Sequence, residues 1–218
     1  MKKHRQPSLI IGSISLAAFA VLTAALRLID VQPVGINATN VGFSTFNRWF
    51  HGLTGVHMVL YSVTDWLSLI PLFVCMVFAG TGAAQAIKRR SILRVDPAIL
   101  LLGVYYLAVI LCYLVFEAAA INFRPVLIEG RMEASYPSST TLLVLAVMPT
   151  LVFPLKRMLK PGFFTRLLGA FLHVYSFFMV SARLLSGIHW FTDIIGAILL
   201  STGLFHLFKA AVILFLKR

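Results

Sequence analysis

The chain has 218 residues, of which 60% are hydrophobic and only 12% are charged. Soluble domains are typically about 45–50% apolar and about 25% charged, so this composition excludes a soluble globular enzyme and a disordered chain. The 19 Lys and Arg residues outnumber the 7 Asp and Glu residues, which gives a formal net charge of +12. In an integral membrane protein such an excess marks basic cytoplasmic loops, so we expect a lipid bilayer and not nucleic acid as the partner.

Six segments are long and apolar enough to be spanning helices, which need about 20 mostly apolar residues. They are residues 9–29, 64–87, 98–120, 139–155, 167–185 and 191–216. The second segment contains Pro71, which predicts an interruption of that helix. Between the first two, residues 35–58 repeat aromatic and apolar side chains at steps of three or four, which predicts either an amphipathic helix in the outer membrane interface or a re-entrant segment leading into the second span. Residues 1–218 are therefore predicted to form a single all-helical membrane domain with six transmembrane helices.

Basic residues concentrate in alternate connections between the predicted spans. Thirteen of the 19 lie before the first span, between the second and third, between the fourth and fifth, or after the sixth: Lys2, Lys3, Arg5, Lys88, Arg89, Arg90, Arg94, Lys156, Arg157, Lys160, Arg166, Lys217 and Arg218. Since cytoplasmic loops are enriched in Lys and Arg, both termini are predicted to be cytoplasmic. Arg124 and Arg183 fall on the outer side, where topology does not require them.

Three groups of polar residues lie at the outer ends of the later spans. Arg124 ends the third span just before a proline, and a guanidinium can bind a phosphate through two parallel hydrogen bonds. Residues 136–141 read Tyr-Pro-Ser-Ser-Thr-Thr, which is typical of a helix N-terminus that can hold an anion. His189 and Asp193 are four residues apart, so on a helix the carboxylate would orient the imidazole as a nucleophile. Each pattern also has a structural interpretation, as a snorkelling arginine, an ordinary N-cap or a structural His–Asp pair.

The predicted topology places all three groups on one side of the membrane. Arg183 precedes His189 by six residues and adds positive charge to the same region. Two arginines, a helix N-terminus and a carboxylate-oriented histidine are the groups that phosphoryl transfer through a phosphohistidine requires.

From residue 117 to residue 193 the chain resembles the type 2 phosphatidic acid phosphatase superfamily, a group of membrane lipid phosphatases with six transmembrane helices. The third family motif, Ser-Arg-x5-His-x3-Asp, is matched by Arg183, His189 and Asp193, with Ala182 in place of the leading serine. The resemblance implies that His189 is the nucleophile, that Asp193 orients it, and that Arg183 binds the phosphate.

The other two family motifs, Lys-x6-Arg-Pro and Pro-Ser-Gly-His, are matched in part. Arg124 and Pro125 fit the end of the first motif, and Pro137 and Ser138 fit the start of the second. The resemblance implies that Arg124 is a second phosphate ligand and that Ser138, with Ser139 and nearby backbone N–H groups, holds phosphate oxygens. This set of groups requires neither a metal nor a cofactor.

Two positions depart from these motifs. Glu117 stands where the family has lysine, and a carboxylate near a phosphate is repulsive unless it is protonated or paired, with Arg124 or Arg131 as the expected partner. Thr140 stands in place of the second-motif histidine, which in the family is the general acid for the leaving group. Threonine cannot take that role at neutral pH, and general acid catalysis is worth roughly 10²–10⁴ in rate.

Three functions are compatible with this sequence. The first is a phosphatase at the outer face of a bacterial plasma membrane, acting on a phospholipid phosphate or prenyl diphosphate whose leaving group needs little protonation, or with water, His51 or His57 as proton donor. The second is a lipid phosphotransferase, and the third is a non-catalytic lipid-phosphate binder or transporter. The His189–Asp193 pair favours a catalytic function. The spacing of His51, His57 and Asp65 fits no strong metal-ligand pattern, so no metal site is predicted.

Overall fold

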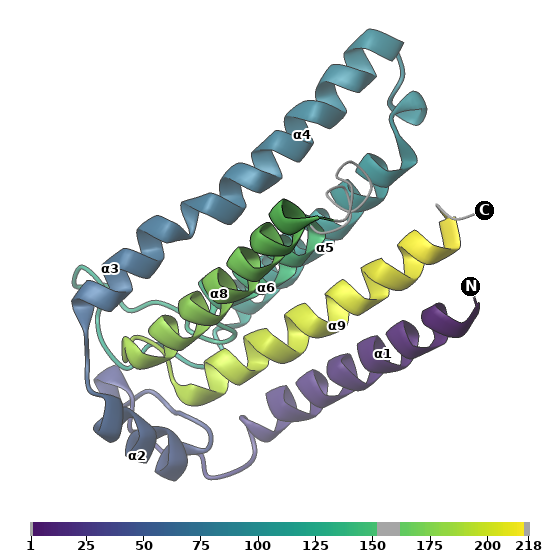
Figure 1. The fold of residues 1–218 in the computed structure, drawn as a ribbon. Helices are drawn as coiled ribbons and strands as arrows, with labels where there is room; N and C mark the ends of the chain where they lie inside the picture. Colours follow the sequence, from purple (N-terminus) through teal and green to yellow (C-terminus); the bar gives the residue numbers. More distant parts are fainter. Residues whose placement is uncertain (1, 152–161, 216–218) are drawn as a thin grey trace.

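The computed structural model describes residues 2–151 and 162–215, and helices form most of it (Figure 1). The helices are α1 (Lys2–Ala25), α2 (Ser44–Thr54), α3 (Met58–Leu67), α4 (Leu69–Arg89), α5 (Pro97–Ala119), α6 (Ser139–Val147), α8 (Phe163–Leu185) and α9 (Phe191–Phe215), with 3-10 turns η1 (Ile36–Ala38), η2 (Ile92–Arg94) and η3 (Met148–Leu151). Within the described residues there are isolated β-bridges but no strand. The predicted all-helical class is confirmed.

Five stretches of helix in the described part of the chain are long and apolar enough to cross a membrane. They are Gln6–Ala25, Met58–Arg89, Pro97–Ala119, Phe163–Leu185 and Phe191–Phe215. The predicted fourth span appears as a shorter apolar helix, Ser139–Leu151, and residues 152–155 of that prediction lie outside the described residues. The protein is therefore an integral membrane protein, whereas the sixth span and the side on which the termini lie stay predictions.

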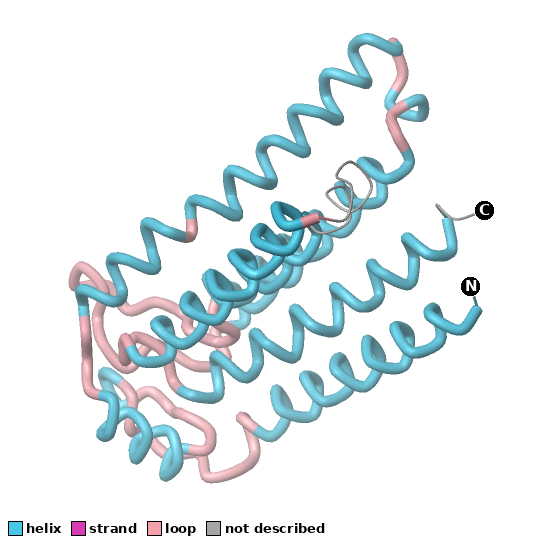
Figure 2. The backbone as a smooth tube through the Cα atoms, viewed as in Figure 1, coloured by secondary structure: helices cyan, strands magenta, loops and turns pink. Residues whose placement is uncertain are grey.

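The second span is broken at Ser68, before Pro71, so that α3 and α4 form two helices (Figure 2). A proline has no N–H to donate and its ring collides with the carbonyl four residues earlier, here that of Leu67, but it is tolerated in the first turn of a new helix. Pro71 accordingly lies in the first turn of α4. The break separates α3, which packs on α8, from α4, which packs on α5.

Helix α9 forms the centre of the bundle and contacts α1, α5, α6 and α8. Its longest contact is with α1, which lies beside it along its length (Figure 1). A Cβ added to Gly203 of α9 would lie 2.6 Å from the Leu16 side chain of α1, so the glycine permits this close approach. On another face of α9, Phe208 stacks on Tyr105 of α5 with ring centroids 4.7 Å apart.

An amphipathic helix is present in residues 35–58, as α2, whereas its place in the membrane interface stays a prediction. Ser44 and Asn47 are buried on its inner side, whereas the large side chains of Phe46, Trp49 and Leu53 are exposed. Exposed aromatic and aliphatic side chains on one helical face are what an interface helix presents to lipid.

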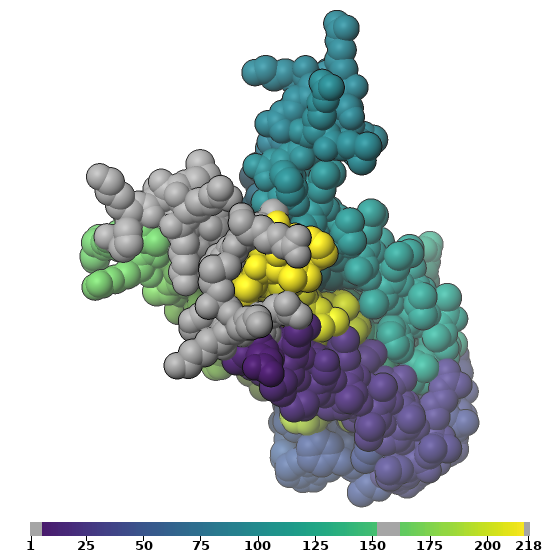
Figure 3. Space-filling view, turned by 90° about the vertical axis from the view of Figure 1, so that its right-hand side faces the viewer, coloured from purple at the N-terminus to yellow at the C-terminus, as the bar shows by residue number. Residues whose placement is uncertain are grey.

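The two ends of the bundle differ in what they carry. The N- and C-terminal ends of the described chain and the α4–α5 connection lie at one end, and α2, the α5–α6 loop and the α8–α9 turn lie at the other (Figures 1 and 2). Seen from the first end, the α4–α5 connection projects beyond the rest of the molecule (Figure 3). The exposed side chains of Lys88, Arg89 and Arg90 lie in that projection. The three predicted polar groups meet at the opposite end.

Candidate active site

Arg124 is positioned by the loop between α5 and α6, which folds back on itself. The Arg124 backbone N–H donates to the Glu133 carbonyl at 3.0 Å, and the Ser135 N–H donates to the Asn122 carbonyl at 2.9 Å. The Arg124 side chain is buried even though it belongs to a loop, and its Nε lies 3.1 Å from Oε2 of Glu133. Glu133 is therefore the ionic partner of Arg124, in place of the expected Glu117.

Ser138 and Ser139 begin helix α6 close to Asp193. The Ser138 N–H donates to the Asp193 carbonyl at 3.1 Å, and the Ser138 hydroxyl donates to Oγ1 of Thr141 at 3.1 Å. The Ser138 side chain therefore does not cap the helix. The backbone N–H groups of a first turn have no partner inside their own helix, so an uncapped start is suited to binding an anion. Thr140 lies in this turn and is also buried.

Asp193, in the first turn of α9, faces the imidazole of His189. Its Oδ2 lies 3.7 Å from Nδ1 of His189, which is beyond hydrogen-bond distance, and both side chains are buried. The Trp190 N–H donates to the same oxygen at 2.9 Å, and Nδ2 of Asn122 donates to the other at 3.3 Å. These bonds fix the carboxylate on the Nδ1 side of the ring, and Nε2 has no hydrogen-bond partner among the described residues. Catalytic contacts are often long before substrate binds and tighten in the complex.

The turn that carries His189 is held by the segment around α2. Gly187 has a φ of +67°, and a Cβ there would overlap the backbone carbonyl at the end of α2, so this position requires glycine. His51 donates from Nε2 to the Gly187 carbonyl at 3.0 Å, and His57 donates from Nε2 to the Thr54 carbonyl at 2.8 Å. Both histidines, considered above as proton donors, thus bond to backbone at the end of the bundle that carries the site.

Arg183, in the last turn of α8, is 2% exposed and is held by α3. Its Nη1 donates to Oγ1 of Thr64 at 3.0 Å and to the Tyr61 carbonyl at 3.4 Å. Its Nη2 lies 3.6 Å from Oδ1 of Asp65, and the guanidinium lies 4.7 Å from the centre of the Tyr61 ring. Since the Asp65 side chain is 59% exposed, solvent screens this ion pair, and the buried Thr64 hydroxyl is the firmer anchor.

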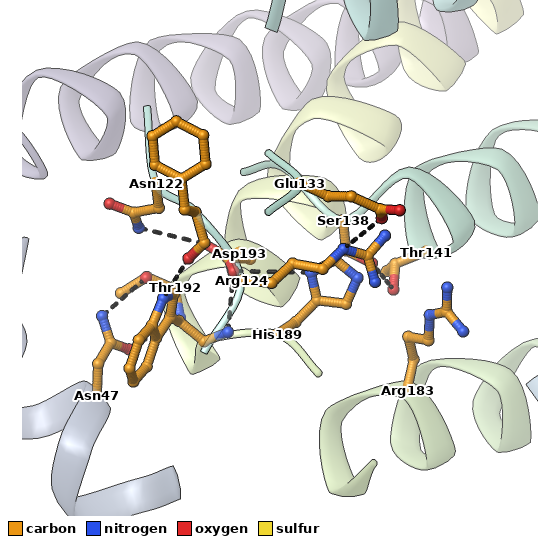
Figure 4. A network of polar contacts seen from close by, with 12 residues as sticks. Asn47, Asn122, Arg124, Glu133, Ser138, Thr141, Arg183, His189, Thr192 and Asp193 are labelled. Atoms are coloured by element: carbon orange, nitrogen blue, oxygen red, sulfur yellow. Dashed lines mark hydrogen bonds and ion pairs between the residues drawn. The ribbon is translucent and has the colours of Figure 1, made fainter. Parts of the chain in front are cut away.

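Arg124, Arg183 and His189 point into the same space beside the first turn of α6 (Figure 4). Burial, followed by the positive charges of Arg124 and Arg183, holds the pKa of His189 well below its usual value. The imidazole is therefore neutral at pH 7, as a nucleophile must be.

Five buried nitrogens at this place have no hydrogen-bond partner within residues 2–151 and 162–215: Nδ1 and Nε2 of His189, Nε and Nη1 of Arg124, and Nε of Arg183. Two of them, Nδ1 of His189 and Nε of Arg124, lie near a carboxylate, and the other three have no such contact. A buried donor without a partner costs about 1–3 kcal/mol and more when it is charged, so native proteins rarely keep one without a purpose. The positive charge and the free donors of this cluster suit an anionic ligand. The same part of the chain contains no group of three His, Cys, Asp or Glu residues placed to hold a metal.

A cavity of about 10 Å³ adjoins His189. It is lined by Tyr113, Phe116, Glu117, Ala134, Ser135, Tyr136, Pro137, Ser139 and His189. A cavity of this volume has room for about one water molecule.

Glu117 comes from the last turn of α5 and is exposed on the side away from the cavity. It makes no ion pair or hydrogen bond with any described residue, so the expected pairing with Arg124 or Arg131 is not formed. Thr140 does not line the cavity.

Sequence reasoning missed the residues that hold the two arginines. Asp65 and Glu133 lie far from the motifs or between them, and no local spacing connects them with Arg183 or Arg124. A signal was nevertheless present, because a chain this apolar contains only 7 acidic residues. Each acidic residue near a span is a functional candidate in such a protein.

No protein-family model matches the sequence, and no curated protein is significantly similar to it. Among solved structures, the transmembrane PAP2 type phosphatidylglycerolphosphate phosphatase from Bacillus subtilis is similar, with a TM-score of 0.63 and 19% sequence identity over 91% of this chain and 94% of that chain. The chain has the PAP2-type fold. The helical fold implied by the sequence resemblance is thus confirmed, whereas its six transmembrane helices stay a prediction. At this identity the similarity concerns the fold alone and leaves the roles of individual residues to be argued from the site described above.

Proposed function

We propose that the protein is a member of the type 2 phosphatidic acid phosphatase superfamily and hydrolyses a lipid phosphate or diphosphate at the outer membrane face. The observation that carries this proposal is the meeting of a neutral, buried His189 with two unpaired guanidinium nitrogens, Nη1 of Arg124 and Nε of Arg183. A purely structural His–Asp pair would not need two buried arginines with free donors beside it.

In the proposed reaction, Nε2 of His189 attacks phosphorus while the bond from phosphorus to the leaving oxygen breaks. Arg124, Arg183 and the N–H groups at the start of α6 bind the three equatorial oxygens, on which charge accumulates. The proton on Nδ1 stays with His189 and is stabilised by Asp193 as the ring gains positive charge. Water then attacks phosphorus, the N–P bond breaks, and inorganic phosphate and neutral His189 are released.

An apolar groove of about 540 Å³ between α1 and α5 offers a place for the lipid chain. It is lined by Phe19, Ala20, Thr23, Ala24, Arg27, Leu28 and Phe116. Phe116 also lines the cavity beside His189, so a chain in the groove would bring its head group to the site from within the bilayer. A phosphate is larger than the cavity beside His189. We therefore expect the exposed wall of that cavity, at Glu117, to move when substrate binds.

The proposed orientation follows from charge. The exposed Lys88, Arg89, Arg90 and Arg94 lie at the end opposite the site, and the positive-inside rule places that end in the cytoplasm. The site would then face the outside, which in a bacterium is the outer leaflet of the plasma membrane.

The test is phosphate release by the purified protein from phosphatidic acid, phosphatidylglycerol phosphate and undecaprenyl diphosphate. We expect release from at least one substrate, loss of that activity in His189→Ala, and no loss in His173→Gln, a change of an exposed histidine on α8 that lies outside the site. The proposal would be contradicted if the wild type released phosphate from none of these substrates, or if His189→Ala released it at the wild-type rate.

A second candidate, non-catalytic binding of a lipid phosphate, is favoured by one observation, the buried threonine at position 140 in place of a proton donor. Lipid binding without turnover in the same assay would support it. Transfer of the phosphoryl group to an added alcohol would instead indicate a phosphotransferase.

A further inference from the structure

The cavity beside His189 joins two groups that the proposed mechanism has not yet connected. His189 comes from the α8–α9 turn and Glu117 from the last turn of α5, and both line this space of about 10 Å³. Glu117 is the one carboxylate among its lining residues. The volume matches a single water molecule, and the serine and tyrosine residues of the lining can offer such a water hydrogen bonds.

On this basis, and resting on the proposed function, we propose that Glu117 is the catalytic base that activates the water which hydrolyses the phosphohistidine. In a double displacement the second nucleophile takes the place of the departed leaving group. Once the wall at Glu117 has moved to admit the phosphoryl group, the space between the phosphorylated His189 and Glu117 is where that water would bind. A carboxylate within hydrogen-bond reach of the water would accept its proton as the oxygen attacks phosphorus.

The other candidate bases have different contacts. Asp193 lies on the Nδ1 side of the ring and accepts hydrogen bonds from Trp190 and Asn122. Glu133 is paired with Arg124. Glu117 is bound to no described residue, and its exposure gives the proton a path to solvent after each turnover.

The step balances without a further reactant. The oxygen of water forms a bond to phosphorus, the N–P bond breaks, and its electron pair returns to Nε2 of His189. One proton of the water passes to the Glu117 carboxylate and then to solvent. The products are inorganic phosphate and the neutral imidazole, so the site is ready for another substrate.

The same assignment points to the substrate class. Thr140 supplies no proton, and Glu117 acts as a carboxylate, so the first step must release a group that departs without a general acid. The lipid monophosphate that leaves from a lipid diphosphate meets this condition, because it is already a stable anion. An alkoxide from a phosphate monoester does not. We therefore infer that a lipid diphosphate is preferred over a monoester.

The test follows the two steps separately, using undecaprenyl diphosphate labelled in its terminal phosphate. In Glu117→Gln we expect phosphohistidine to form at the wild-type rate, its hydrolysis to slow by about 10²-fold or more, and the acid-labile phosphoenzyme to accumulate. Glu117→Lys, which restores the family residue, should lose turnover in the same way. Glu129→Gln removes an exposed carboxylate from the α5–α6 loop, outside the cavity, and should behave as the wild type.

The outcomes separate this inference from the proposed function. Wild-type protein that neither releases phosphate nor forms phosphohistidine contradicts the proposed function itself. Wild-type turnover retained in Glu117→Gln, or raised in Glu117→Lys, overturns only the role of Glu117. If Glu117→Gln forms no phosphoenzyme while Glu117→Asp does, Glu117 acts in the first step and the assignment as base is wrong. Equal rates on a monoester and on the diphosphate would contradict the inferred substrate class.

Discussion

Replacing Asp193 by asparagine tests the contact on which the proposed nucleophile depends. The change keeps the size of the side chain but removes its negative charge, and it turns one of the two oxygens into an N–H donor. Oδ2 faces the Trp190 N–H at 2.9 Å and Nδ1 of His189 at 3.7 Å. An amide nitrogen there would meet two donors. An amide in the opposite orientation would meet the donor of Asn122. Either way the negative charge that supports the imidazole is lost.

The magnitude follows from the distance at which the carboxylate acts. At 3.7 Å and an effective dielectric constant of about 20, a positive charge forming on His189 is stabilised by about 4.5 kcal/mol relative to a neutral partner. The asparagine dipole recovers part of this, so we expect a loss of about 3–4 kcal/mol. Since about 1.4 kcal/mol corresponds to a factor of ten in rate, formation of phosphohistidine should slow by roughly 10²–10³-fold.

The assay is a single-turnover measurement of phosphohistidine in detergent-solubilised protein, with Asp96→Asn as the control. Asp96 caps α5, where its carboxylate accepts from the Ala98 N–H at 2.9 Å, at the end of the bundle that lies away from His189. We expect Asp96→Asn to retain the wild-type rate. An Asp193→Asn protein that is folded and keeps a rate within threefold of the wild type would refute the orientation of His189 by Asp193.

Three further predictions concern the supports of the site. Thr64→Val removes the hydroxyl that accepts from Arg183, a charged hydrogen bond worth about 1.5–3 kcal/mol, so kcat/KM should fall at least about tenfold while Thr64→Ser retains most activity. Gly187→Ala introduces a Cβ at positive φ against backbone and should lower the Tm by several degrees, whereas Gly80→Ala, with open space around it, should not. Because the pKa of His189 is lowered in the folded protein, the histidine of the unfolded chain is protonated first as the pH falls. The free energy of unfolding should therefore decrease below about pH 6.5, by up to about 1.4 kcal/mol per pH unit. Unfolding in denaturant between pH 7 and pH 5 measures this slope, and His189→Gln should flatten it.

The positions of the helices were largely predictable because each depends on a local run of residues. Residues 98–120 and 191–216 agree closely with Pro97–Ala119 and Phe191–Phe215. The sequence predicts an interruption of the second span at Pro71, whereas the structure has the break at Ser68. The break comes earlier because the proline ring disturbs the preceding turn. Predicting that position requires the geometry of the helix as well as the identity of the residue.

The candidate site was predictable only where its members are close in sequence. The spacing of His189 and Asp193 places both on one side of a turn, and the structure brings them within 3.7 Å. The anchors of the arginines come from distant elements. Thr64 of α3 meets Arg183 because α3 breaks away from α4 and packs on α8, and no periodicity in the sequence encodes that encounter.

The net charge of +12 combines two kinds of basic residue, and burial separates them. Lys88, Arg89 and Arg90 are exposed at the end of the bundle with the chain termini and need no ionic partner. Arg124 and Arg183 are buried, and a buried guanidinium requires compensation, which Glu133 and Asp65 supply only in part through one contact each. An anion bound by the cluster, as proposed above, would satisfy the donors that have no partner among the described residues, so the free energy that destabilises the empty cluster would favour a phosphate. A site of this kind therefore links stability to ligand: phosphate or a phosphate analogue should raise the Tm of the wild type, as ligands that bind only the folded state do, and should do so less in a variant that lacks either arginine.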